Sequence, residues 1–401
     1  MGVVKSKRRV LVILGAGASI EYGIPATQKF TDIIETAILG DRWVQNQKGD
    51  EAYRTIKRRL KRYLHDPGIV HFEQIYHCAH ELIHFSKPSK GIVDEYRPIL
   101  VPFLRDTSKT TKEGLRALVK KVVEVIYNEV IARCATPAHS VASFGEFLTA
   151  LEVTSIPRIY TTNYDDFALQ AKPDLYTGYD RKGAKETIFD IEGFWQRWNE
   201  PSLFFLHGSV HMSYSHQLGQ GRFADLVWFD DANEARKSAT FNGSGLRKMD
   251  GTEVLRSPIV TGLEKLSRLQ QRPLPYFYAA LTRDMMEADI IYVIGAGLGD
   301  LHLNMLLAEA RSRPDPAPML FVDWWDGGFD LDMETPDRKS IEMLHALRIN
   351  IGGDAPAPTR VDDWLVSADG TSAIWSGGFQ AFLRETNQHA LVRVALRTRK
   401  P

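Results

Sequence analysis

Short, continuous apolar runs are the main feature of the pattern of hydrophobic and polar positions in this chain. The first run, residues 10–14, leads directly into Gly15-Ala16-Gly17-Ala18-Ser19. A run without polar interruption predicts a buried strand of a parallel sheet, and the glycines predict a tight turn after it. A helix should follow, because the next apolar residues lie at helical spacing: Phe30, Ile33, Ile34, Ala37 and Ile38.

Five later apolar runs predict further strands, and each run leads into a polar or glycine-containing segment. These runs cover residues 158–160, 203–206, 257–261, 290–294 and 319–322. Apolar residues at helical spacing predict helices at 51–64, 72–85, 112–133 and 301–311. Strands that alternate with helices predict an α/β fold, namely a Rossmann-like doubly wound parallel sheet with a helical insertion and a C-terminal extension.

The chain divides into three predicted parts. Residues 8–40 and 140–330 should form the sheet domain, and residues 41–139, which have few strand signals, should form the helical insertion. The C-terminal extension covers 331–401, with helices expected at 340–347 and 377–385 and a loop at 352–358. This extension is expected either to complete the sheet or to make contacts with a partner.

Composition and charge argue against several classes of protein. The chain has 401 residues, of which 44% are hydrophobic and 25% charged, as in an ordinary globular protein. Its 50 Lys and Arg balance its 50 Asp and Glu, so a dedicated nucleic-acid or membrane-surface binder is not expected. The densest basic run, residues 54–62, is expected to be a solvated helix face, with docking of nucleic acid or an acidic partner as the alternative.

The cysteine count and the N-terminal pattern limit the metal chemistry and the compartment. Cys78 and Cys134 cannot form a disulfide framework or a zinc site with four thiolates. The basic N-terminal residues precede only five apolar residues, and no apolar stretch reaches the roughly 18 to 20 residues that span a bilayer. A cytoplasmic protein without a bound metal is therefore expected.

Candidate chemistry follows four of the predicted strands. The segments are Gly15 to Ser19 with Gly23-Ile24-Pro25, Thr161 to Asp165, Leu206-His207-Gly208, and Gly295 to Asp300. In a doubly wound sheet these segments converge on one crevice. The first turn alone is a weak signal for a dinucleotide phosphate, because Ile20 stands where the third glycine of the usual fingerprint is expected. A tight turn with no ligand is the alternative for that motif.

Taken together, the ordered motifs resemble the sirtuin superfamily, and specifically the bacterial sirtuin-like group found in defence against phage. The matching elements occur in the family order and extend into His302-Leu303-Asn304. They frame about half of the chain, residues 10–40 and 150–325. The resemblance implies a Rossmann-like NAD-binding domain.

The resemblance also implies roles for individual residues. Asn163 would position the nicotinamide ribose and a water, Asp165 would hold the carboxamide, and His207 would be the catalytic histidine. Ala16, Gly17 and Ser19 would contact the diphosphate, and the turn from Gly295 to Gly297 would hold the adenosine ribose. The full implied set of NAD-binding residues is Gly15, Ala16, Gly17, Ser19, Pro25, Thr162, Gly295, Gly297 and Asp300. An amide, a carboxylate and a base of near-neutral pKa suit cleavage of the nicotinamide glycosidic bond, whose leaving group is neutral.

Two departures from the family pattern favour water as the acceptor of the ADP-ribose group. Protein-deacylating sirtuins carry a zinc module of two cysteine pairs, which two widely separated cysteines cannot build. They also carry an acidic-aromatic-basic triplet where this chain has Ala26, Thr27 and Gln28. The expected activity is therefore an NAD glycohydrolase that releases nicotinamide and ADP-ribose, rather than a deacylase.

Unrestrained NAD consumption would be toxic, so the resemblance implies a regulated effector that depletes NAD in abortive infection. It further implies a homo-oligomer with a dedicated partner, such as an ATPase, an Argonaute-like protein or a nucleotide-handling subunit. Two other interpretations of the motifs remain. One is a non-catalytic module that binds NAD or an ADP-ribose derivative, and the other is a Rossmann oxidoreductase. A binding module would not need Asn163, Asp165 and His207 together, so their joint presence argues against it.

Several other residues have a plain structural interpretation. Packing or solvated helix positions are expected for a histidine cluster that could otherwise suggest a metal site: His65, His71, His77, His80 and His84. His211 is not expected to be catalytic. Packing is also expected for Trp324 and Trp325, with an adenine pocket as the alternative.

Overall fold

A mostly parallel sheet of eight strands forms the centre of the molecule. The computed structural model describes residues 7–64, 70–85, 111–181, 185–215, 225–239, 242–247, 253–262, 265, 271–325, 358–361 and 364–384. The strand order is β11-β12-β13-β10-β9-β1-β2-β4, and neighbours are parallel from β13 to β4. The strands are β1 (Arg8–Leu14), β2 (Ser155–Thr161), β4 (Ser202–Phe205), β9 (Ile290–Ile294), β10 (Met319–Val322), β11 (Thr359–Val361), β12 (Trp364–Val366) and β13 (Ser372–Trp375).

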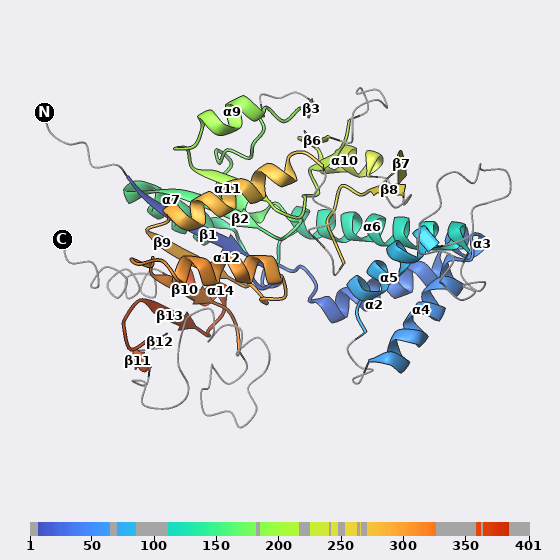
Figure 1. Ribbon diagram of the computed structural model, residues 1–401, viewed down its shortest axis with the longest axis horizontal. Coiled ribbons are helices and arrows are strands. Elements are labelled where there is room, and N and C mark those ends of the chain that lie inside the picture. Colours follow the sequence, from blue (N-terminus) through green and yellow to red (C-terminus); the bar gives the residue numbers. More distant parts are fainter. Residues whose placement is uncertain are drawn as a thin grey trace, which may run out of the picture.

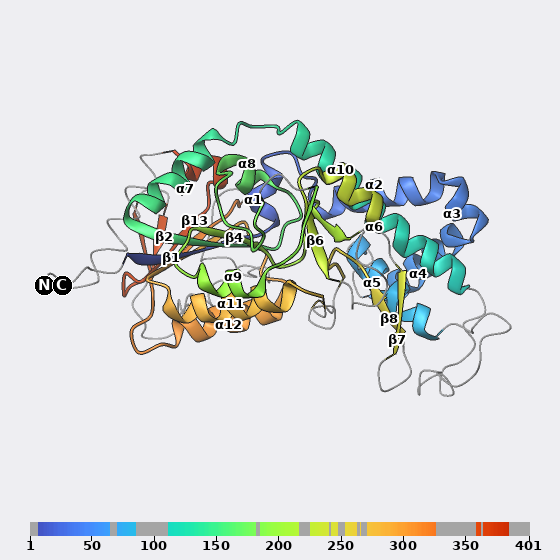
Figure 2. The same cartoon turned by 90° about the horizontal axis from the view of Figure 1, so that it is seen from above.

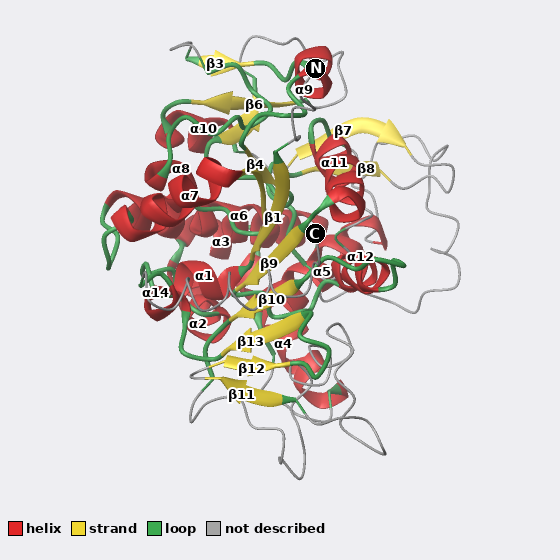
Figure 3. Ribbon diagram, turned by 90° about the vertical axis from the view of Figure 1, so that its left-hand side faces the viewer, coloured by secondary structure: helices red, strands yellow, loops and turns green. Residues whose placement is uncertain are grey.

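Helices cover both faces of this sheet, as Figures 2 and 3 show. One face carries α1 (Ala16–Ile20), α7 (Ala142–Thr154), α8 (Phe167–Ala171) and α14 (Phe379–Phe382). The other carries α9 (Ile191–Gln196), α11 (Leu274–Glu287) and α12 (Leu301–Arg311). The chain runs from β1 outward to β2 and β4, then returns to β9 on the other side of β1. The predicted α/β class with a doubly wound parallel sheet is therefore confirmed.

A group of helices lies at one end of the molecule, away from β11–β13 (Figure 1). It comprises α2 (Thr27–Gly40), α3 (Arg42–Asn46), α4 (Gly49–Tyr63), α5 (Phe72–Phe85) and α6 (Lys112–Ala135). The helix α6 contacts α2, α4 and α5, and it buries residues around most of its circumference, which explains its high content of aliphatic side chains. The helices expected at 51–64, 72–85 and 112–133 therefore form, with small shifts of their ends.

The segment 257–261 is not a strand, and this prediction was wrong. Strand β8 (Glu253–Arg256) ends before it and pairs with β7 (Asn242–Arg247) in a separate antiparallel sheet of two strands. Pro258 cannot donate to a strand ladder, and the Val260 N–H donates instead to the His207 carbonyl at 2.9 Å. Ile259 and Val260 are fully buried against that turn, so the apolar run reflects burial without sheet pairing.

A second small sheet lies beyond the β4 edge and was not predicted. It has the order β3-β6-β5 and is antiparallel, with the helix α10 (Ala232–Ser238) beside it. Its strands are β3 (Glu186–Thr187), β5 (Met212–Tyr214) and β6 (Leu226–Phe229). These strands have two to four residues, which is too short for a hydrophobic period to be recognised in the sequence.

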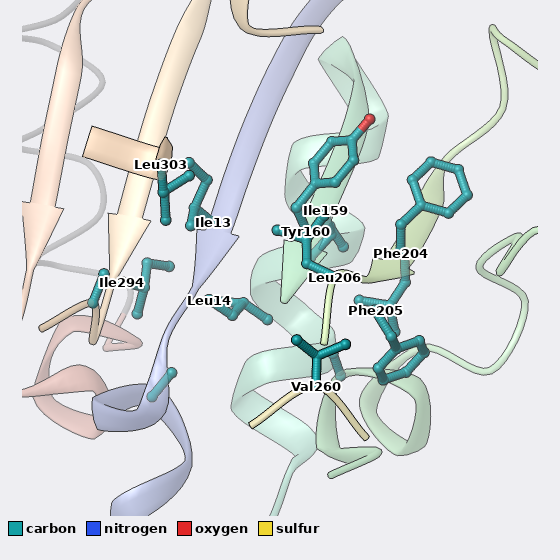
Figure 4. Close-up of a cluster of buried hydrophobic side chains, with 14 of the residues drawn as sticks. Ile13, Leu14, Ile159, Tyr160, Phe204, Phe205, Leu206, Val260, Ile294 and Leu303 are labelled. Carbon is teal, nitrogen blue, oxygen red and sulfur yellow. The ribbon is translucent and has the colours of Figure 1, made fainter. Parts of the chain in front are cut away.

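Part of the buried core lies at the carboxyl ends of the central strands. Residues 10–14 of β1 are at most 3% exposed, as expected for a strand covered on both faces. Figure 4 shows that side chains from neighbouring strands and loops meet there. Those drawn include Ile13, Leu14, Ile159, Tyr160, Phe204, Phe205, Leu206, Val260, Ile294 and Leu303. This packing fixes the carboxyl ends of the strands and so positions the segments that follow them.

The C-terminal residues extend the sheet and dock on the first turn. Strand β13 pairs in parallel with β10, and α14 follows it. The Glu21 carboxylate, at the end of α1, accepts hydrogen bonds from the Phe379 and Gln380 N–H groups, both at 2.7 Å. Glu21 thus caps α14 and ties it to the segment after β1. The helix expected at 340–347 and nearly all of the loop at 352–358 lie outside the described residues.

Glu21→Ala should lower the free energy of unfolding by about 1–2 kcal/mol, because two N–H groups of α14 lose a charged acceptor. Urea denaturation would measure this loss. Glu309→Ala is a suitable control, since Glu309 is exposed on α12, and it should change the unfolding midpoint little. Equal midpoints for the two variants would show that the cap contributes nothing.

Candidate active site

A cavity of about 610 Å³ opens at the carboxyl ends of the central strands. It lies where the strand order reverses between β1 and β9, the usual ligand position in an open α/β sheet. All predicted site residues except Gly17 and Gly295 line it: Gly15, Ala16, Ser19, Pro25, Thr162, Asn163, Asp165, His207, Gly297 and Asp300. The four predicted strand-end segments therefore meet at one place.

The two glycines outside the cavity join the two turns to each other. The Gly17 N–H donates to the Gly295 carbonyl at 2.8 Å, and the Gly15 N–H donates to the Ile294 carbonyl at 2.8 Å. An added Cβ on Gly17 would lie 2.7 Å from the Gly295 Cα. The N–H of Gly17 is therefore already used within the protein, and this glycine permits close packing of backbones, in contrast to the expected phosphate contact.

Asn163 is held in place by the first turn. Its Nδ2 donates to the Gly15 carbonyl and to the Ser19 hydroxyl oxygen, each at 2.8 Å. Both donor positions are thereby used, so Asn163 presents its carbonyl oxygen Oδ1 to the cavity that it lines. The first two predicted segments are connected directly, and the orientation of the amide is fixed by backbone as well as by side chain.

Asp165 lies two residues further and is only 8% exposed. Burial raises the pKa of its carboxyl, a hydrogen bond from Ser19 opposes this, the neighbouring Asp166 adds to it, and the resulting pKa is about 6. Ser19 therefore contacts both Asn163 and Asp165. A carboxyl of this pKa carries a negative charge at pH 7 but takes up a proton in mildly acidic solution.

Asp165→Asn should remove a pH dependence of stability. In the folded state the pKa is about 6, against 3.8 for an unperturbed aspartate. Between about pH 4 and pH 6 the folded protein holds a proton that the unfolded chain has lost, so this group makes stability fall as pH rises through that window. At pH 7 the variant should exceed wild type in unfolding free energy by about 1–3 kcal/mol.

Urea denaturation at pH 4, 5, 6 and 7 would measure this effect. Asp32→Asn changes an exposed aspartate on α2 and should follow the wild-type pH profile. If Asp165→Asn shows the same profile as wild type, Asp165 does not hold the proton assigned to it.

His207 follows β4 and is 1% exposed. Burial and, after it, Lys265 lower the pKa of its imidazole, Asp300 partly opposes them, and the resulting pKa is about 3. His207 is therefore neutral at physiological pH and has one ring nitrogen able to accept a proton. Its pKa lies well below the near-neutral value expected for this base from the sequence, because the side chain is buried. Its Nε2 lies 3.2 Å from the Tyr278 hydroxyl and 3.9 Å from Oδ2 of Asp300.

A charged group that the sequence did not reveal occupies one wall of the cavity. Lys265 Nζ lies 2.8 Å from Oδ1 of Asp300 and 4.0 Å from Oε1 of Glu73. Although burial raises the pKa of Asp300, His207 and Lys265 together lower it below its ordinary value. Glu73 lies in the first turn of α5, far away in sequence, and also accepts a hydrogen bond from the Thr261 hydroxyl at 3.3 Å. No motif surrounds Lys265 or Glu73, so sequence patterns could not have identified them.

Asp323 lies close to the first glycine turn, although it is not among the residues that line the cavity. It directly follows β10, which pairs with β9, and its Oδ1 lies 3.1 Å from the position of an added Cβ on Gly17. In dinucleotide-binding folds the carboxylate that contacts a ribose stands about 20 residues after the glycine turn, whereas Asp323 follows a strand that β9 separates from β1. The sequence does show an acidic residue directly after an apolar run, residues 319–322. It does not show the order of the strands, which places that residue near the first glycine turn.

The residues with a plain structural interpretation mostly lie elsewhere. His211 does not line the cavity; its Nε2 lies 3.1 Å from Oδ2 of Asp166, and its ring stacks on Trp228. His71 does line the cavity. Within the described part of the chain, no three His, Cys, Asp or Glu side chains are grouped to hold a metal. His65 and the side chain of His84 fall outside that part.

The remaining candidates are found at the surface. Trp324 is 60% exposed, so the packing expected for it is wrong, whereas Trp325 packs partly buried against the core. The basic run at 54–62 lies on α4, where its arginines face solvent, as expected for a solvated helix face. No helix among the residues described is long and apolar enough to cross a membrane.

Comparison with solved structures identifies Sir2 homologues as similar to this chain. A mutant Sir2 homologue in complex with 2′-O-acetyl ADP ribose has 14% identity and a TM-score of 0.41, over 98% of this chain and 96% of that one. A Sir2 homologue–NAD complex has 13% identity and a TM-score of 0.42, over 97% and 91%. No protein-family model and no curated protein matches the chain. The likeness is distant, and the α/β class of this chain stands on its own strand order.

Proposed function

We propose that this protein hydrolyses NAD at the bond between nicotinamide and ribose, releasing nicotinamide and ADP-ribose. The observation that carries the proposal is the meeting of Asn163, Asp165 and His207 with the Gly15 turn in one cavity. An oriented amide, a buried carboxyl and a neutral imidazole are the groups that this reaction needs. The resemblance of the same motifs to sirtuin-like NAD hydrolases supports the assignment.

The shape of the cavity supports NAD as the substrate. Gly297 and Gly299 line it, and an added Cβ on either would meet nothing within 4 Å, so backbone is open to a ligand there. The first turn adds the backbone of Gly15 and Ala16, and Asp323 lies behind Gly17. These features suit a phosphate beside the first turn and a ribose toward β9 and β10.

The protein's own residues then divide the work. The Asn163 carbonyl oxygen is fixed by the two hydrogen bonds of its amide nitrogen and accepts a hydrogen bond from the ribose or from the attacking water. The nicotinamide is neutral when it leaves, so no strong acid is needed at the leaving group. His207 accepts the proton that water loses as its oxygen bonds to the ribose carbon. Asp165, anionic at pH 7, favours the positive charge that develops on the ribose.

Water as the acceptor is supported by two residues that line the cavity. Ala26 and Thr27 stand at two of the three positions, 26–28, where deacylating sirtuins have an acidic-aromatic-basic triplet. The two cysteines of the chain cannot supply four zinc ligands. Both features favour hydrolysis over capture of an acylated lysine.

We further infer that this activity belongs to a regulated effector that depletes NAD in defence against phage, because of the resemblance of the motifs to that group. The helical segment 41–139 and the C-terminal segment 331–401 are the proposed contacts for self-assembly and for a dedicated partner. The partner would be an ATPase, an Argonaute-like protein or a nucleotide-handling subunit. Purification of the protein from its native cell would identify the partner needed in the activity assay.

Product analysis tests the proposed reaction. Protein with its partner is incubated with NAD, and nicotinamide, ADP-ribose and NADH are quantified by mass spectrometry. Equal amounts of nicotinamide and ADP-ribose, lost in Asn163→Ala, are expected. Binding of NAD without any product would instead indicate a non-catalytic module, and NADH formation an oxidoreductase. Either result overturns the proposal.

A further inference from the structure

Three polar side chains from three different elements form a hydrogen-bonded chain that leads away from the cavity. His207 follows β4, Tyr278 lies on α11, and His302 lies in the first turn of α12. The Tyr278 hydroxyl lies 3.2 Å from Nε2 of His207 and 2.9 Å from Nε2 of His302. His207 lines the cavity, whereas Tyr278 and His302 lie outside its lining.

The two ends of this chain differ in their access to water. His207 is 1% exposed, but Tyr278 and His302 are half-buried, and Leu301 beside His302 is 67% exposed. A substrate in the cavity would cover the open side of His207. A proton taken up by His207 could then reach solvent along the Tyr278 hydroxyl and His302 while the cavity is still filled.

We propose that Tyr278 and His302 are positioning residues that form the proton outlet of His207. The inference rests on the proposed function, because it concerns the proton that His207 takes from the attacking water. The attacking water gives its proton to Nδ1 of His207, and the resulting imidazolium donates the proton on Nε2 to the Tyr278 oxygen. The Tyr278 hydroxyl donates its own proton to Nε2 of His302. His207 becomes neutral again and His302 becomes an imidazolium, which releases the proton to bulk water.

The electrostatic surroundings favour transfer in this direction. Burial lowers the pKa of both histidines, but His302 is less buried, so its imidazolium is better solvated. Burial also raises the pKa of the Tyr278 hydroxyl, which keeps it a neutral carrier. Among the described residues, Asp300 and Lys265 are the charged side chains that act on both histidines: Asp300 raises the pKa of each, and Lys265 lowers it. Glu73 faces Lys265 at 4.0 Å.

Tyr278→Phe is the most specific test, because it removes the hydroxyl and keeps the ring that packs against His302 at a centroid distance of 5.2 Å. It should lower kcat for nicotinamide release by about tenfold to a hundredfold with KM for NAD nearly unchanged. Tyr276→Phe is the matched control on the same helix; its ring stacks on Phe189, away from His207, and kcat should not change.

Chemical rescue separates a proton carrier from a structural contact. His302→Ala should lose kcat to a similar extent, and added imidazole should restore most of it, because the site is half-buried and open to small solutes. Failure of imidazole to restore kcat, or equal kcat values for Tyr278→Phe and Tyr276→Phe, overturns the outlet.

A measurement without substrate keeps the outlet separate from the proposed function. In protein with ¹⁵N-labelled histidine, the Nε2 signal of His207 should shift as His302 titrates, and Tyr278→Phe should abolish that response while Tyr276→Phe retains it. If wild type releases no nicotinamide, the proposed function fails and this measurement alone decides the outlet. A His207 signal that ignores the titration of His302 overturns the outlet even in an active enzyme.

Discussion

Gly295→Ala should lower the free energy of unfolding by about 4 kcal/mol and abolish binding of NAD. Gly295 has a φ of +64°, a left-handed conformation that alanine adopts with strain. More importantly, an added Cβ would lie 2.0 Å from the Ala18 nitrogen and 2.5 Å from the Gly17 carbonyl carbon. Both atoms belong to backbone, so the two turns at the carboxyl edge must move apart and lose the Gly17 to Gly295 hydrogen bond.

Gly297→Ala is the matched control for this substitution. Gly297 lies two residues away in the same turn, and an added Cβ would meet nothing within 4 Å. The unfolding free energy of the Gly297→Ala variant should stay within about 1 kcal/mol of the wild-type value. Urea denaturation of both variants measures the difference, and similar midpoints would contradict the close packing of the two turns.

His207→Asn should lower kcat for nicotinamide release by about 10²- to 10⁴-fold, because it removes the base that we propose takes the proton from water. KM for NAD should change far less, since the Gly15 turn and the backbone at Gly297 remain. Steady-state kinetics at pH 7 provides the measurement. His139→Asn, which alters an exposed histidine, should behave as wild type. A variant His207→Asn with wild-type kcat would exclude His207 as the base.

The same substitution has a second, independent signature in stability. His207 has a folded pKa of about 3, against 6.5 for an unperturbed histidine. Between these values the unfolded chain binds a proton that the folded protein does not, so stability is fully present above pH 6.5 and is lost as pH falls toward 3. In His207→Asn this part of the acid sensitivity should disappear. Persistence of the full acid sensitivity would show that His207 is not buried as a neutral ring.

The central strands could be predicted from sequence because both of their faces are buried. Residues 10–14 and 290–294 form apolar runs without polar interruption, and both became strands. Because parallel strands end at the same edge, the polar segments after them could be expected to meet. Ser19, Asn163 and His207 follow three different strands of the sheet and line one cavity for this reason.

The remaining features depend on contacts between distant parts of the chain. The segment 257–261 has the composition of a strand, but Pro258 and the His207 carbonyl direct its backbone elsewhere. Glu73 and Lys265 reach the cavity through the packing of α5 and of a loop, and neither stands in a motif. The position of Asp323 near the first glycine turn could not be predicted without knowing that β10 lies next to β9. Burial of His207, which sets its pKa, is likewise a property of the whole fold.

The most direct test of the central claim is the rate of nicotinamide release from NAD at pH 7 by the protein with its partner. Wild type should release nicotinamide with an equal amount of ADP-ribose and no NADH. Asn163→Asp, which keeps the size of the side chain but removes the donors to Gly15 and Ser19, should reduce that rate by about a hundredfold or more. No nicotinamide from wild type, or equal rates for wild type and Asn163→Asp, would contradict the assignment of this cavity to NAD hydrolysis.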